Sequence, residues 1–205
     1  MVLIIISIVF GVITTALKSN RKIDKRSLSI LTKVLTTFCV FIAVVSWSVK
    51  NGNYSGWRLL LSLGILFGVL GDFFMEFEKF FLYGMLSFLV GHVFYIFSFR
   101  SNGGFPNALI LTFVLCIGIA YYFFIQNKLG KDKIPVLVYV LAISTMLAFS
   151  SNMSLLTFLG ALLFFVSDAI LAYDKYVKSV PLRDFLILST YFSGQILIGI
   201  SAMLR

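Results

Sequence analysis

The sequence predicts an all-α integral membrane protein, folded as a bundle of eight transmembrane helices. Of its 205 residues 60% are hydrophobic, and the mean hydropathy is +1.03. Only 12% of the residues are charged, about half of the roughly 25% found in soluble domains. No long polar segment interrupts the apolar runs. Residues 1–205 are therefore expected to form one polytopic membrane domain.

Eight apolar runs are each long enough, or nearly so, to cross about 30 Å of hydrocarbon. The first run has no basic residues before it, as a signal peptide would, so we expect it to be a retained helix. Short loops separate the runs and join antiparallel neighbours. The expected helices span residues of about 2–17, 28–49, 57–77, 80–99, 107–125, 134–150, 154–173 and 182–203.

The Lys and Arg residues predict the orientation, because loops rich in these residues stay in the cytoplasm. Of the 17 basic residues, 12 lie in or beside the odd-numbered loops and 4 on the other side, while Lys33 lies inside a helix. Both termini are therefore expected outside. Short loops and the lack of eukaryotic targeting signals favour a bacterial cytoplasmic membrane. The first loop contributes Lys18, Arg21, Lys22, Lys25 and Arg26.

The net charge of +9 does not indicate a nucleic-acid partner. The basic residues lie in short loops between apolar runs, where they determine topology and contact anionic lipid headgroups. The expected partner is the lipid bilayer. The sequence does not determine an oligomeric state.

An offset of 96 residues relates two parts of the chain. It predicts two parallel four-helix repeats, at about residues 1–100 and 107–205, with an axis along the membrane normal. Chance similarity between two apolar, glycine-containing helices is the alternative. The related pairs are Gly64 and Gly160, Asp72 and Asp168, Glu78-Lys79 and Asp174-Lys175, and Tyr95 and Tyr191.

Asp72 and Asp168 are the candidate catalytic residues. Each lies in an apolar helix, where an ionisable group costs several kcal/mol and is a functional hypothesis by default. A rise of about 1.5 Å per residue places both, and Lys33, about 8 Å from the inner ends of their helices. We expect Lys33 to pair with these carboxylates, although it could also extend to the headgroups.

Four further polar residues lie deeper in the apolar helices: His92, Tyr95, Tyr191 and Gln195. They are candidates for binding substrate or positioning water, and interhelical hydrogen bonding is the alternative role. Charges nearer the boundary are expected to be solvated in the headgroup layer, with a role in the site as the alternative for Glu76 alone: Glu76, Glu78, Lys79, Asp174 and Lys175.

The chemistry expected of this set is acid–base catalysis by two carboxylates. The chain has one His and two isolated cysteines, Cys39 and Cys116, so we expect no metal site and no cofactor. No nucleophile-elbow motif is present. Two carboxylates in a low-dielectric site share one proton, which provides one acid and one base. Such a pair suits reactions through an oxocarbenium ion, such as cleavage of acetal-like or enol-ether bonds.

Several short motifs, in order, resemble those of the YhhN-like lysoplasmalogenase family. The resemblance covers residues from about 28 to 200. Lys33 resembles a family lysine that is usually followed by proline, but Val34 follows it here, which puts the local helix shape in doubt. The motifs are Lys33 followed by Leu35-Thr36-Thr37, Leu70-Gly71-Asp72, Gly91-His92-Val93-Phe94-Tyr95, Phe165-Val166-Ser167-Asp168 and Thr190-Tyr191-Phe192-Ser193-Gly194-Gln195.

The resemblance implies a multi-pass hydrolase that cleaves the vinyl-ether bond of lysoplasmalogens without a required metal. The products would be a fatty aldehyde and glycerophosphocholine or glycerophosphoethanolamine. Asp72 and Asp168 would then be catalytic, in an order that the sequence leaves open. The sequence also allows a small proton- or cation-coupled transporter that uses both Asp residues, or a non-catalytic lipid-binding protein.

Overall fold

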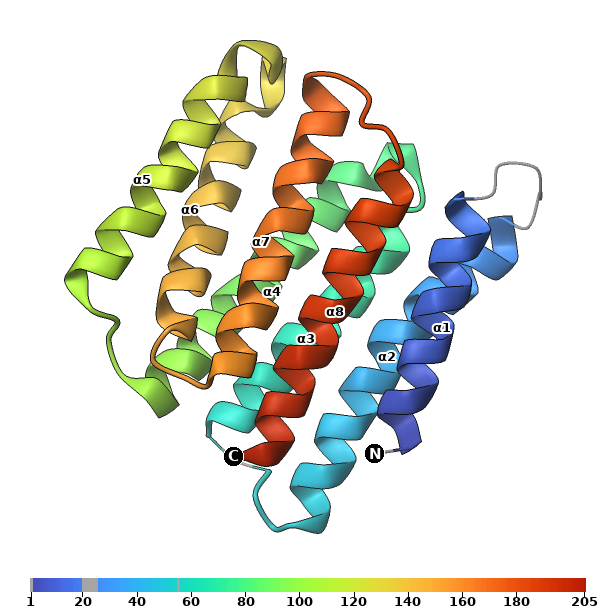
Figure 1. Ribbon diagram of the computed structural model, residues 1–205, viewed down its shortest axis with the longest axis vertical. Helices are drawn as coiled ribbons and strands as arrows, with labels where there is room; N and C mark the ends of the chain where they lie inside the picture. The colour runs from blue at the N-terminus through green and yellow to red at the C-terminus, as the bar shows by residue number, and fades with distance from the viewer. Residues whose placement is uncertain (1, 20–25, 55) are drawn as a thin grey trace.

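The computed structural model describes residues 2–19, 26–54 and 56–205 (Figure 1). Within these ranges the chain is all-α, and eight of its helices are long and apolar enough to cross a membrane, which confirms the predicted fold class of an integral multi-pass membrane protein. The helices are α1 (Val2–Ser19), α2 (Arg26–Lys50), α3 (Trp57–Phe74), α4 (Phe81–Gly103), α5 (Ala108–Ile125), α6 (Lys133–Ser150), α7 (Leu155–Tyr176) and α8 (Arg183–Leu204), with short 3₁₀ turns at Glu78–Phe80, Gln126–Lys128 and Gly130–Asp132.

The helix ends agree with the expected ones within a few residues, and the differences have local causes. Helix α4 continues to Gly103 instead of residue 99, and it ends where Gly104 adopts a left-handed φ of 77°. Helix α3 ends at Phe74 instead of residue 77. There the backbone hydrogen bonds span three residues instead of four. They run from the Glu76 N–H to the Phe73 carbonyl and from the Phe77 N–H to the Phe74 carbonyl.

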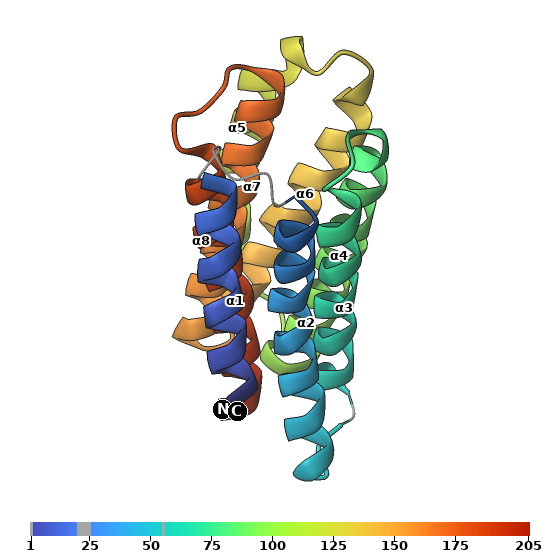
Figure 2. The same ribbon diagram turned by 90° about the vertical axis from the view of Figure 1, so that its right-hand side faces the viewer.

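Six helices form a closed ring, in which neighbours pack in the order α2, α3, α4, α6, α7 and α8, and α8 returns to α2. Helix α1 packs outside this ring on α2 and α8, and α5 packs outside it on α6 (Figures 1 and 2). Both termini lie at one end of the bundle, and the α3–α4, α5–α6 and α7–α8 loops lie at the other (Figure 1). Of the charges used to predict orientation, Arg21, Lys22 and Lys25 lie outside the described residues.

The predicted duplication stays a prediction. If residues 1–100 corresponded to 107–205, α1 would correspond to α5, and both of these helices are peripheral. The contact between α2 and α8 would correspond to the contact between α6 and α4, and both contacts are present.

Two helix pairs pack most closely through glycines. In α3 and α4, a Cβ added at Gly64 would lie 2.7 Å from the Tyr95 ring and 3.1 Å from the Gly91 carbonyl oxygen. In α7 and α8, a Cβ at Gly160 would lie 2.8 Å from the carbonyl oxygen of Gly194. Small residues at membrane helix interfaces allow this close approach of backbones. The two approaches bring the polar side chains of α3 and α8 into the middle of the bundle.

We predict that Gly160→Ala destabilises the protein by about 1–3 kcal/mol, because the new methyl group meets backbone that cannot move without separating α7 from α8. A lower midpoint of thermal unfolding in detergent would show this. Gly11→Ala is the matched control, since a Cβ there would lie 3.3 Å from the Phe192 ring, a side chain that can shift. Equal midpoints for the two variants would contradict the prediction.

Candidate active site

A cavity of about 450 Å³ lies at the end of the bundle away from the termini. Side chains from α1, α2, α3, α4, α7 and α8 line it, together with residues of the loops after α3 and α7. Both candidate carboxylates, Asp72 and Asp168, are among them, as are Lys33 and Tyr191. Residues about 100 positions apart in the sequence therefore share one polar cavity.

Asp72 is fully buried near the end of α3. Its Oδ2 accepts hydrogen bonds from the Thr37 hydroxyl at 2.5 Å and the Tyr191 hydroxyl at 2.8 Å. Its Oδ1 accepts no hydrogen bond from any described residue and lies 3.7 Å from Nζ of Lys33. One oxygen is thus held by two hydroxyl groups, and the other is buried beside the Lys33 ammonium.

Lys33 connects Asp72 to a second buried carboxylate. Its Nζ lies 3.0 Å from Oε1 of Glu76, and Nζ of Lys18 lies 2.5 Å from the same oxygen. Lys33 therefore pairs with carboxylates inside the bundle, as its depth in the sequence indicated. The expectation that Glu76 is solvated was wrong, because only 7% of its side chain is exposed. The early end of α3 turns this residue back over the cavity, where it meets both lysines.

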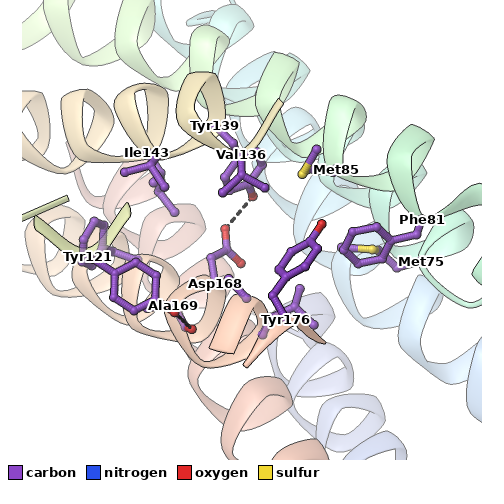
Figure 3. Close-up of a pocket in the computed structure, with 14 residues that line it drawn as sticks. Met75, Phe81, Met85, Tyr121, Val136, Tyr139, Ile143, Asp168, Ala169 and Tyr176 are labelled. Atoms are coloured by element: carbon purple, nitrogen blue, oxygen red, sulfur yellow. Dashed lines mark hydrogen bonds between the residues drawn. The ribbon is translucent and has the colours of Figure 1, made fainter. Parts of the chain in front are cut away.

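Asp168 has its own partners on α6 and α4. Its Oδ2 accepts a hydrogen bond from the Tyr139 hydroxyl at 2.5 Å (Figure 3). Nε2 of His92 lies 3.0 Å from that hydroxyl and 3.6 Å from Asp168 Oδ2. Since the Tyr139 proton points to Asp168, its oxygen accepts from a protonated Nε2 of His92, a tautomer assigned from this network.

A small apolar pocket of about 60 Å³ adjoins the polar cavity at Asp168. Figure 3 shows the Asp168 carboxylate pointing between Tyr139 and Tyr176, with Val136, Ile143 and Met85 around the pocket. Asp168 thus has a charged cavity on one side and apolar side chains on the other. This is the position expected of a group that acts where the polar and apolar parts of an amphipathic molecule meet.

Tyr95 and Gln195 lie behind the cavity. The Tyr95 hydroxyl donates to Oε1 of Gln195 at 2.8 Å, and the Gln195 amide lies 3.5 Å from the Tyr191 hydroxyl. Gly68 makes room for this amide, since a Cβ at Gly68 would lie 2.7 Å from it. Neither Tyr95 nor Gln195 lines the cavity. They contact the site only through Tyr191, which donates to Asp72.

The two aspartates form separate units. Asp72 is held by Tyr191 of α8, and Asp168 by Tyr139 of α6, with no hydrogen bond between the two carboxylates among the described residues. We expected from the sequence that the two carboxylates share one proton, but no direct hydrogen bond between them is present among the described residues to hold it. In the part of the chain that the structure describes, no group of three or more His, Cys, Asp and Glu residues could hold a metal ion.

Comparison with known proteins decides the family. The model of the YhhN family matches residues 28–202. The chain belongs to the YhhN family. This match contains every candidate site residue from Lys33 to Gln195 and confirms the resemblance seen in the motifs. Lys18 lies on α1, which precedes the matched segment.

Several named relatives are similar over most of their length. The chain is 32% identical over 163 residues to lysoplasmalogenase TMEM86B of Mus musculus, covering 79% of this chain and 70% of the relative. It is 31% identical over 189 residues to lysoplasmalogenase TMEM86A of Bos taurus, covering 85% and 78%. It is 30% identical over 176 residues to lysoplasmalogenase TMEM86B of Homo sapiens, covering 84% and 74%. No solved structure matches the chain significantly.

Two residues of the site, Thr37 and Tyr139, were not named as candidates from the sequence, and Glu76 was given a site role only as an alternative. Thr37 stands among several hydroxyl residues in one helix, and Tyr139 is one of nine tyrosines. The helical periodicity of the sequence and the expected depth of a residue in the membrane do not tell which of these side chains faces a carboxylate on another helix. A search for polar residues at the depth of both aspartates would have included Thr37, one turn from Lys33.

The loop after α3 makes stability depend on pH. Burial by itself raises the pKa of the Glu76 carboxyl, but Lys33 and Lys18 outweigh burial and hold the pKa below its ordinary value of 4.5. A carboxyl with a lowered pKa adds stability that is present above its ordinary pKa and is lost as pH falls through the folded value.

We therefore predict that wild-type protein is more stable than Glu76→Gln at neutral pH, and that the gap narrows as pH falls below about 4.5. Gln keeps the size of Glu but cannot titrate. Thermal unfolding of both proteins in detergent at several pH values measures the gap. A gap independent of pH would contradict the ion-pair assignment of Glu76.

Proposed function

We propose that this protein is a lysoplasmalogenase, which hydrolyses the vinyl-ether bond of lysoplasmalogens to a fatty aldehyde and glycerophosphocholine or glycerophosphoethanolamine. The observation that carries the proposal is the placement of Asp72 and Asp168 on one cavity with a charged mouth, with Asp168 adjoining an apolar pocket. The relatives named above are lysoplasmalogenases, which supports the same activity. Nothing in these comparisons supports the transporter.

The cavity suits the polar part of such a lipid. Lys18, Lys33 and Arg183 line it, and these are cations that can approach a phosphate. Arg183 is held in place by Asp174 at 2.7 Å and Asp184 at 2.8 Å. With the phosphate among these cations and the hydrocarbon chain on the apolar side of Asp168, the vinyl ether lies beside the carboxylates.

The reaction needs one proton donor and one group that activates water. Asp168, at the apolar boundary, donates its proton to the vinyl carbon that is not bonded to oxygen. This leaves an oxocarbenium ion at the carbon that bears the ether oxygen. Asp72, through its unbonded Oδ1, stabilises this cation and accepts a proton from the attacking water. The hemiacetal then divides into aldehyde and alcohol: its O–H proton passes to Asp168, Asp72 gives its proton to the leaving alcohol oxygen, and both carboxyl groups return to their starting states, so the reaction consumes one water.

The remaining candidates act as positioning residues in this proposal. Tyr191 holds Asp72 Oδ2, so that Oδ1 faces the cavity. Gln195 and Tyr95 fix the Tyr191 ring and hydroxyl. His92 holds the Tyr139 hydroxyl against Asp168, and Lys33 balances the charge of Asp72 and faces the phosphate. No step in this scheme uses a metal or another cofactor.

The orientation in the membrane is part of the proposal. The basic residues near the mouth of the cavity lie at the end of the bundle where the odd-numbered loops are, so we place this end in the cytoplasm and both termini outside. The short loops favour a bacterial cytoplasmic membrane. The glycerophospho-base product would then leave on the cytoplasmic side.

Replacing either carboxylate tests the mechanism. Removing a general acid or base typically costs about 10²- to 10⁴-fold in rate. We predict that Asp72→Asn and Asp168→Asn each lower aldehyde release from lysoplasmenylethanolamine by at least about 100-fold. Purified protein in detergent is assayed with and without a chelator, and we expect wild-type activity to survive chelation.

The folded state of each variant is checked by its thermal midpoint. Absence of aldehyde release from folded wild-type protein would refute the lysoplasmalogenase. Retained activity in one Asn variant would refute the role given to that residue, and loss on chelation would refute the metal-free scheme.

Tyr139 gives a second test of the site. Asp168 becomes charged as its proton leaves, and a hydrogen bond to a charged group is worth about 1.5–3 kcal/mol, so we predict that Tyr139→Phe lowers kcat roughly 10- to 100-fold and changes KM little. Tyr122→Phe is the matched control, since Tyr122 is also buried but lines neither the polar cavity nor the apolar pocket. A rise in KM at constant kcat would show that Tyr139 contributes to binding and does not position Asp168.

A further inference from the structure

A long apolar groove runs along the outside of the bundle between α5 and α7. Its volume is about 1,220 Å³, and its walls are almost entirely apolar. Helix α6 lies between these two helices in Figure 1, and its Leu147 contributes to the groove. Phe113 of α5 and Phe158, Leu162 and Val166 of α7 form the walls.

The groove adjoins the apolar pocket at Asp168. Phe165 lines both of them. On α6 the lining passes from Tyr139 and Ile143 in the pocket to Leu147 in the groove, in steps of four residues that share one helix face. On α7 it passes from Asp168 to Phe165 and then to Leu162 and Phe158, again in steps of three or four. The seam between α6 and α7 thus leads from the carboxylate to the lipid-facing surface.

The dimensions fit a lipid chain. The pocket of about 60 Å³ is far smaller than the roughly 300–1,000 Å³ of typical ligand sites, so it can hold only a short part of a chain. Leu155, at the far end of the groove, is 13 residues from Asp168 on α7. At about 1.5 Å per residue this is about 20 Å, more than the roughly 15 Å of one hydrocarbon leaflet.

A second apolar groove does not have this connection. It lies between α1 and α8, has a volume of about 650 Å³, and is lined by residues such as Ile8, Val12 and Phe192. It shares no lining residue with the cavity that contains Asp72 and Asp168, or with the apolar pocket. The residue shared with the pocket of a carboxylate therefore distinguishes the α5–α7 groove from an ordinary lipid-facing surface.

We propose that the α5–α7 groove binds the alkenyl chain of the substrate, which reaches Asp168 sideways from the bilayer past Phe165. This inference rests on the proposed lysoplasmalogenase activity and adds the subsite for the chain. The headgroup occupies the polar cavity, the vinyl ether lies at Asp168, and the chain follows the α6–α7 seam. Phe165, at the junction, contacts the first carbons of the chain.

Blocking the groove partway along tests the proposal. Leu162 is six residues from Asp168, about 9 Å along α7, and its side chain is 36% exposed. A Trp there obstructs a long chain and does not reach a short one. We expect Leu162→Trp to lower kcat/KM for an octadecenyl lysoplasmalogen about tenfold, equivalent to about 1.4 kcal/mol. A hexenyl lysoplasmalogen should be cleaved within about twofold of the wild-type rate.

Leu86→Trp is the matched control. Leu86 is 43% exposed on α4 and lies outside the groove, so both substrates should be cleaved as by wild type. Equal loss with both substrates in a folded Leu162→Trp protein, or loss with neither, would overturn the chain subsite and leave the lysoplasmalogenase standing. Absence of cleavage of both substrates by wild type would overturn the function itself.

A second measurement does not depend on cleavage. A non-hydrolysable alkyl lysophospholipid with a diazirine at the end of its chain is photolysed with the wild-type protein, and the labelled peptides are identified by mass spectrometry. We expect labelling within residues 155–166 that excess lysoplasmalogen suppresses. Labelling that resists this competition would show bulk lipid in the groove and overturn the proposal, and competed labelling at the α1–α8 groove would do the same.

Discussion

The site depends on charges buried inside a membrane bundle. Lys33 lies between Asp72 and Glu76, and Lys18 contacts Glu76 from α1. Each of these ions would be costly alone in a low-dielectric interior, and removing one partner leaves the others uncompensated. The pairing therefore ties α1, α2 and the end of α3 together at the mouth of the cavity. It also holds Asp72 in a position where hydroxyl groups from α2 and α8 reach one of its oxygens.

Close packing of the helices sets the geometry around these charges. Glycines bring α3 against α4 and α7 against α8, which leaves space for Tyr95, Gln195 and Tyr191 to form a buried chain of hydrogen bonds to Asp72. A similar arrangement on the other side joins His92, Tyr139 and Asp168. Each carboxylate thus meets a tyrosine from a different helix, so that each has one oxygen already held. Such prior positioning is what acid–base catalysis requires of its groups.

The two carboxylates have different surroundings, and the mechanism that we propose rests on this difference. Asp72 lies beside a lysine in a fully buried polar setting, whereas Asp168 borders both the polar cavity and the apolar pocket. An amphipathic substrate has its own boundary between polar and apolar parts, and its vinyl ether lies at that boundary. The match between the two boundaries explains why a reaction of lipids can take place at the edge of a transmembrane helix bundle.

The sequence alone determined the fold class, the eight helices, the family and three charged residues of the candidate site, Lys33, Asp72 and Asp168. Apolar runs of membrane length and costly intramembrane charges are local properties, and they can be read along the chain. Only the tertiary structure decided which side chains meet. In the structure, Tyr139 donates to Asp168, Glu76 is buried, and the two aspartates have separate partners. These contacts depend on how each helix is rotated about its axis and on where α3 ends. The rotation of a helix and its distance from its neighbours are set by packing between helices that are distant in sequence. The periodicity within one helix does not specify this packing.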